Sequence, residues 1–196
     1  MPVRPIERKL AAIFAADIAG YSRLMARDEV GTLARLKACR TVIDGLIASH
    51  RGRIFNTAGD SVVADFASAV DAVQCAVAVQ AAIGTEDTGG AADEPMQLRI
   101  GVHVGDVMVD GDNLLGDGVN IASRLQGLTE PDTICISDVV YRDVAKKLAL
   151  GTVVSFGRPK LRNIAERFEV FALLSVPPIG IRRKWSGTST TCAGRG

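Results

Sequence analysis

Several features that commonly identify a protein class are missing from this chain of 196 residues. Its four cysteines lie far apart and form no CxxC pair. Cys39, Cys75 and Cys135 stand among apolar residues, which predicts core positions and a reducing compartment. No apolar run is long enough to span a membrane, so we expect no membrane segment. Lysine and arginine total 23 against 22 acidic residues, and the net charge of +1 gives no indication of nucleic-acid binding.

The two ends of the chain are interpreted differently. Near the N-terminus, basic residues precede a short apolar run, as in a signal peptide. The run ends early, at Asp17, so we predict a first strand and a cytoplasmic protein. The length suits one domain with a real core, which we place at residues 1–174. Residues 175–196 include Pro177-Pro178, four basic residues and no acid, and we expect a basic, disordered tail there.

Apolar periodicity predicts an α+β protein without internal repeats. Strands are expected at residues 10–16, 53–57, 61–66, 97–109, 133–137, 152–156 and 168–173, and helices at about 28–49, 68–83, 117–128 and 138–148. The Gly-, Asp- and Thr-rich segment 84–94 is expected to be a loop. The first half follows the order β-α-β-β-α-β, so we predict a ferredoxin-like βαββαβ core with additional αβ elements.

Two aspartates each stand at the end of an apolar stretch, with small residues close to them. Asp17 stands in FAADIAGYS and Asp60 in NTAGDSVVADF. Either aspartate alone is better explained as a turn or helix cap. Two such places in one small domain favour paired carboxylates that hold divalent metal over a phosphate.

A third motif, GDGVNIASR, lies in the predicted helix 117–128. Asn120 and Arg124 are four residues apart and therefore share a helix face, so both can reach one phosphate. A solvated Arg beside an incidental Asn is the common alternative. The preceding Gly116 and Gly118 make that alternative weaker, because glycine permits close backbone approach.

Taken together and in this order, the three motifs resemble those of the class III nucleotide cyclases, the adenylate and guanylate cyclases. The resemblance covers about residues 8–173 and assigns residues 1–174 to a cyclase catalytic domain. It implies a homodimer in which each active site is built from both subunits. It also implies two Mg²⁺ or Mn²⁺ ions per site and a nucleoside triphosphate substrate.

Roles for individual residues also follow from the resemblance alone. Metal would be held by the carboxylates of Asp17 and Asp60 and the carbonyl of Ile18. In the opposite subunit, Asn120 would orient the ribose and Arg124 would stabilise the α-phosphate. The residues implied in phosphate binding are Ala19, Gly20, Tyr21, Ser22 and, at a position where the family has Lys, Arg162. A surface role for Arg162 is an equal alternative.

The sequence departs from many adenylate cyclases at the two positions that contact the base. Asn56 stands where a Lys is usual, and Asn113 where an Asp is usual, with Asp112 adjacent and available after a one-residue slip. An amide offers both a donor and an acceptor, so an Asn pair suits adenine and also tolerates guanine. ATP is favoured, but GTP stays open.

The prediction is therefore an adenylate cyclase, a phosphorus–oxygen lyase that makes 3′,5′-cyclic AMP and pyrophosphate by two-metal-assisted in-line attack. A guanylate cyclase and a catalytically silent, nucleotide-binding regulatory module are the alternatives. Cyclases of this type are often fused to sensor domains, so a regulatory domain or partner outside this chain is expected. Of the two histidines, His103 is predicted to be a core or interface residue instead of a general base.

Overall fold

The computed structural model describes residues 7–85 and 95–174. The predicted tail at 175–196, and most of the predicted loop at 84–94, lie outside the described residues. The strands are β1 (Glu7–Ile18), β2 (Arg53–Ala58), β3 (Ser61–Phe66), β4 (Leu98–Asp110), β5 (Asn113–Leu115), β6 (Thr133–Ser137), β7 (Thr152–Ser155) and β8 (Val170–Leu174). The helices are α1 (Tyr21–Arg27), α2 (Glu29–Ser49), α3 (Ala69–Thr85), α4 (Asp117–Leu128) and α5 (Asp138–Val144).

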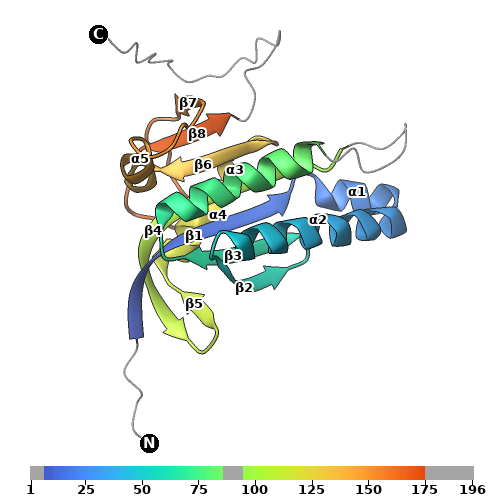
Figure 1. Cartoon of the computed structure of the whole chain (residues 1–196), viewed down its shortest axis with the longest axis horizontal. Coiled ribbons are helices and arrows are strands. Elements are labelled where there is room, and N and C mark those ends of the chain that lie inside the picture. The colour runs from blue at the N-terminus through green and yellow to red at the C-terminus, as the bar shows by residue number, and fades with distance from the viewer. Residues whose placement is uncertain (1–6, 86–94, 175–196) are drawn as a thin grey trace, which may run out of the picture.

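The strands form one sheet in the order β2-β3-β1-β4-β6-β8-β7, and β5 pairs with β4 (Figure 1). β1 runs between β3 and β4 and is antiparallel to both. The first four strands therefore have the β2-β3-β1-β4 arrangement of a ferredoxin-like core, as the sequence predicts. β6 is parallel to β4, and β8 and β7 extend the sheet beyond it.

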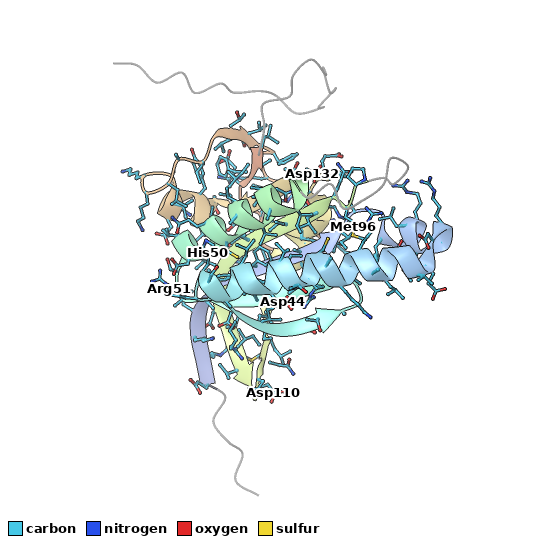
Figure 2. The ribbon with its side chains drawn as sticks, turned by 45° about the vertical axis from the view of Figure 1, so that its right-hand side comes forward. Asp44, His50, Arg51, Met96, Asp110 and Asp132 are labelled. Carbon is cyan, nitrogen blue, oxygen red and sulfur yellow. The ribbon has the colours of Figure 1, made fainter. Side chains whose placement is uncertain are left out.

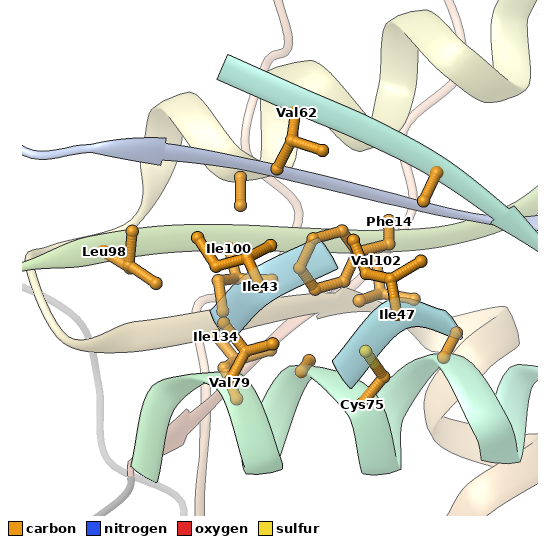
Figure 3. Packing of buried hydrophobic residues seen from close by; sticks show 14 of the residues in the cluster. Phe14, Ile43, Ile47, Val62, Cys75, Val79, Leu98, Ile100, Val102 and Ile134 are labelled. Atoms are coloured by element: carbon orange, nitrogen blue, oxygen red, sulfur yellow. The ribbon is translucent and has the colours of Figure 1, made fainter. Parts of the chain in front are cut away.

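Helices cover the two faces of the sheet unequally. α2 and α3 lie on one face, where the largest apolar cluster contains Phe14, Ile43 and Val79 (Figure 3). α4 lies on the other face, and Ala122 packs with Ile13 of β1 in a smaller cluster. Alternation along β1 explains this division, because successive side chains point to opposite faces of a strand. Both faces of β1 are thus apolar, which accounts for its nearly continuous apolar sequence.

Most of the predicted elements are confirmed, and the differences are local. β1 continues to Ile18, so Asp17 lies within the strand instead of after it. The helix predicted at 138–148 ends at Val144. α1 and β5 were not predicted, because seven and three residues are too short to establish a period. No helix within the described ranges has the length and apolar character needed to cross a membrane.

Candidate functional site

Asp60 contacts the end of β1 at the residue that directly follows Asp17. Asp60 follows Gly59 in the tight β2–β3 turn, where Gly59 has φ 59°. One oxygen of the Asp60 carboxylate, Oδ2, accepts a hydrogen bond from the backbone N–H of Ile18 at 3.0 Å. Ile18 directly follows Asp17, so the fold brings to one place two carboxylates that are 43 positions apart in the sequence.

Arg99 on β4 is a residue of this site that the sequence did not reveal. It lies opposite Asp17 in the β1–β4 ladder, and its Nε and Nη2 donate to the two Asp17 oxygens at 2.9 and 2.6 Å. The Asp17 side chain is 15% exposed, so its charge is partly removed from water and is balanced by this two-pronged ion pair. In this structure the positive charge beside the Asp17 carboxylate is therefore the guanidinium of Arg99.

The turn after Asp17 has its own backbone restraints. Ala19 donates its N–H to the carbonyl of Gln97 at 2.8 Å. Gly20 adopts φ 69°, a left-handed conformation that favours glycine, and α1 begins at the next residue. Tyr21 and Ser22 form the first turn of α1, where backbone N–H groups have no acceptor within the helix.

Asn120 and Arg124 occupy the exposed side of α4. Arg124 Nε donates to the backbone carbonyl of Arg162 at 3.3 Å, so the Arg124 guanidinium lies beside the backbone from which the Arg162 side chain starts. The segment that carries Arg162 is anchored below α4 by Leu161, which is 3% exposed. Asn163, the next residue after Arg162, has φ 62° and turns the chain sharply there.

The two candidate base-reading residues come from separate strands. The β2–β3 register shifts between Ile54 and Asn56, so Phe55 is the extra residue of a bulge and Asn56 lies opposite Val63. Directly opposed residues share a sheet face, and Val63 packs in the cluster beneath α4. The bulge therefore turns Asn56 to the α4 face. Asn113 is the first residue of β5, opposite Asp110.

The two groups of residues are not joined within one chain. In the described ranges, no hydrogen bond or ion pair connects Asp17 or Asp60 with Asn120, Arg124 or Arg162. Arg124 instead turns toward the Arg162 segment. The group with the two aspartates and the group on α4 are therefore separate within one chain. This is the arrangement expected if two chains supply complementary halves of a site.

The donors at the carboxylate pair suit a hard divalent cation. Mg²⁺ prefers oxygen ligands and is usually bound by one or two carboxylates together with waters and substrate phosphates. Among the described residues no group of three or more His, Cys, Asp or Glu side chains gathers as a self-sufficient metal cage. Asp17, Asp60 and the Ile18 carbonyl thus fit a metal that arrives with a phosphate, although Arg99 occupies both Asp17 oxygens in this structure.

His103 lies in a separate region and is buried, as predicted. Its Nδ1 lies 2.8 Å from the hydroxyl of Ser137, and its ring stacks on Phe168 with centroids 5.6 Å apart. Burial lowers the pKa of His103 to about 4, against a smaller opposing effect of Asp138. The ring lines a cavity of about 590 Å³ between the start of α4 and the start of α5, away from the two aspartates. At neutral pH it is an uncharged structural residue.

Comparison with known proteins confirms the family that the sequence resembles. The sequence model of the protein family described as "Adenylate and Guanylate cyclase catalytic domain" matches residues 5–157 of this chain. A protein of Rhizobium meliloti named "Putative adenylate cyclase 3" is 42% identical over 165 residues, which are 84% of this chain and 28% of that protein. An adenylate cyclase of Streptomyces coelicolor is 32% identical over 72% of this chain and 35% of its own length. This chain thus spans about a third or less of these relatives.

Solved structures agree on the fold. A crystal structure described as an adenylate/guanylate cyclase/hydrolase from Silicibacter pomeroyi is 38% identical, with a TM-score of 0.80 over 86% of this chain and 98% of that one. The adenylyl cyclase CyaB from P. aeruginosa has a TM-score of 0.77 over 86% of this chain and 95% of its own. Its identity of 19% makes it informative on the fold alone.

Proposed function

Because the chain belongs to the adenylate and guanylate cyclase catalytic domain family, we propose that it converts ATP to 3′,5′-cyclic AMP and pyrophosphate at sites shared between two copies. The observation that carries this proposal is the hydrogen bond from the Ile18 N–H to Asp60, which places Asp60 against the residue that follows Asp17 and separate from an exposed Asn120 and Arg124. A chain that had lost the reaction would have no need to keep both halves.

The carboxylate half supplies the cation site. Asp17, Asp60 and the Ile18 carbonyl would hold Mg²⁺ or Mn²⁺, which lowers the pKa of a bound hydroxyl and neutralises phosphate charge. Arg99 stays beside Asp17 and adds a positive charge to this half of the site. The N–H groups of Tyr21 and Ser22 at the start of α1 favour an anion at the same point.

The second half is proposed to act on the ribose and the α-phosphate. Asn120 orients the sugar as a neutral donor and acceptor, and Arg124 spreads its charge over the α-phosphate oxygens. Arg162, whose carbonyl already holds Arg124, adds a second cation toward the triphosphate. These residues come from the opposite copy of the chain, so a homodimer has two equivalent sites.

The reaction itself is an in-line displacement. The ribose 3′-oxygen forms a bond to the α-phosphorus and releases its proton to solvent, while the bond from the α-phosphorus to the bridging oxygen breaks and pyrophosphate leaves. Charge gathers on phosphate oxygens, so stabilisation by Arg124 is the largest contribution expected from a single side chain.

The choice of ATP over GTP rests on the relatives and on the residues that face the base. Two relatives are named adenylate cyclases. Asn56 and Asn113 each offer one donor and one acceptor, which suits the adenine edge. The same amides are compatible with guanine, so a guanylate cyclase is the second candidate.

A product assay decides between these candidates. Purified protein is incubated with ATP or with GTP in the presence of Mn²⁺, and the products are resolved by chromatography. Cyclic AMP in excess over cyclic GTP supports the proposal, and the reverse ratio supports the guanylate cyclase. Absence of both products, with nucleotide binding retained, identifies the silent regulatory module.

A further inference from the structure

Arg53 joins two parts of the sheet that are far apart in strand order. It begins β2, the edge strand. β5 pairs with β4 on the side opposite β1, because β1 occupies the other side of β4 from Leu98 to Val109. Yet Arg53 Nη1 donates to the backbone carbonyl of Asp112, in the β4–β5 turn, at 2.9 Å. One guanidinium therefore connects the sheet edge to the tip of the β4–β5 hairpin.

This connection closes a curled portion of the sheet. The small cluster beneath α4 includes Phe55 of β2, Val63 of β3, Ile13 of β1, Val107 of β4 and Leu114 of β5. Five strands can share one small cluster only if the sheet curls around it. The β4–β5 hairpin projects beyond the helices, with Asp110 at its tip (Figure 2). The Arg53 hydrogen bond thus links the turn of this hairpin to β2.

Arg53 is oriented by a buried carboxylate. Asp65 on β3 is 7% exposed, and Lys9 Nζ lies 2.6 Å from its Oδ2. Arg53 Nη2 lies 3.1 Å from Asp65 Oδ1, close enough for an ion pair, although Oδ1 accepts no well-aligned hydrogen bond among the described residues. The planar guanidinium can hold the carboxylate with one nitrogen and the carbonyl with the other, which an ammonium group cannot do at one fixed geometry.

The two segments linked by Arg53 are those that carry the proposed base-reading amides. Asn56 follows Arg53 on β2 after the bulge, and Asn113 directly follows Asp112. Building on the proposed function, we infer that Arg53 is a positioning residue for nucleobase selection, acting through Asn56 and Asn113. Because amides carry both a donor and an acceptor, their separation decides which base edge they match. A loosened hairpin would let the same two amides fit either purine.

The test compares Arg53→Gln with wild type in the cyclase assay, using ATP and GTP separately. Loss of one hydrogen bond, converted at about 1.4 kcal/mol per factor of ten, leads us to expect that the KM for ATP rises roughly two- to thirteenfold. The ratio of kcat/KM for ATP to that for GTP should fall by a similar factor, while kcat at saturating ATP stays within about twofold. Arg53→Lys retains the Asp65 ion pair but should show the same loss of selectivity.

Arg51→Gln is the matched control. Arg51 lies two residues away, just beyond the end of α2 (Figure 2), and its Nη2 is 2.7 Å from Asp71 Oδ1. Among the described residues it makes no hydrogen bond or ion pair with the hairpin. Its substitution should leave the ATP to GTP ratio unchanged. A ratio for Arg53→Gln that also stays within twofold of wild type, in a protein with unchanged thermal unfolding, would overturn the inference.

A second measurement does not depend on catalysis. Amide hydrogen exchange in the peptide around residues 109–116 should be about tenfold faster in Arg53→Gln and Arg53→Lys than in wild type or Arg51→Gln. Equal exchange in all four proteins would refute the link between Arg53 and the hairpin. If wild type makes neither cyclic nucleotide, the proposed function fails and base selection falls with it, while the exchange data still decide whether Arg53 holds the hairpin.

Discussion

The ion pair between Arg99 and Asp17 allows a quantitative test of the carboxylate half. We predict that it is strongly stabilising without metal, because Nε and Nη2 bind both carboxylate oxygens at 2.9 and 2.6 Å. The side chains of Arg99 and Asp17 are 30% and 15% exposed, so water screens the pair only in part. Charge-assisted, two-pronged hydrogen bonds of this kind should give a coupling free energy of about 2 kcal/mol.

A double-mutant cycle measures that coupling. The free energy of unfolding in urea and EDTA is determined for wild type, Arg99→Gln, Asp17→Asn and the double variant. Arg99→Gln alone should lower the melting temperature by about 4–8 °C, since 1 kcal/mol corresponds to about 2–4 °C in a domain of this size. Saturating Mn²⁺ together with a non-hydrolysable ATP analogue should reduce the loss, because metal brought in with the phosphates then serves as counter-ion of Asp17 in place of the guanidinium.

An exposed pair provides the control. Arg8 and Asp106 are also 2.9 Å apart, but their side chains are 61% and 56% exposed. Their coupling should be no more than about 0.5 kcal/mol. A coupling for Arg99 and Asp17 as small as that of the exposed pair would refute the reasoning. So would a loss in Arg99→Gln that Mn²⁺ with the ATP analogue does not reduce.

Two further predictions concern His103, which is buried, and Asp132, which is partly buried. Burial lowers the pKa of His103 from 6.5 to about 4. As the pH falls from 6.5 to 4, this histidine therefore takes up a proton in the unfolded chain before it does so in the folded protein, and the free energy of unfolding decreases. The free energy of unfolding is measured by urea titration at each pH for wild type and His103→Gln. Over this pH range the decrease should be about 3 kcal/mol smaller in His103→Gln than in wild type. Equal decreases in the two proteins would contradict the account. Asp132 has φ 60° and accepts from Gln80 and Gln97. Asp132→Gly should keep the melting temperature within about 3 °C, because glycine favours this backbone conformation and offsets the lost hydrogen bonds. Cyclase activity should fall several-fold, because the carbonyl of Gln97 accepts the hydrogen bond from Ala19 in the proposed phosphate-binding turn. Full activity would contradict a role of Asp132 in positioning that turn.

The fold was predictable because its long elements carry strong patterns. β1 and the long helix α2 repeat apolar residues over many positions, and the order of strands and helices in the first half led to the ferredoxin-like arrangement. β5 and α1 gave no such signal. Their positions are set by tertiary contacts, as when Leu114 of β5 packs into the cluster beneath α4.

The site was predictable only where its residues stand in local motifs. Asp17, Asp60, Asn120 and Arg124 could be singled out from short segments, and their roles stay predictions. Arg99 could not be identified, because its partner lies 82 positions away and becomes its neighbour only through the β1–β4 register.

The β-bulge at Phe55 was equally invisible in the sequence. Strict alternation from Arg53 would have turned Asn56 to the face covered by α2 and α3, and only the β2–β3 register shows otherwise.

The central claim is that a complete active site needs two copies of this chain, and complementation tests it most directly. Asp17→Ala and Arg124→Ala are each expected to be inactive as homodimers. Carrying different affinity tags, they are co-expressed, and the mixed dimer is purified through both tags. One of its two sites is then intact, so cyclic AMP production should recover to about half of the wild-type value. A purified mixed dimer with no activity above its inactive parents would contradict the shared site.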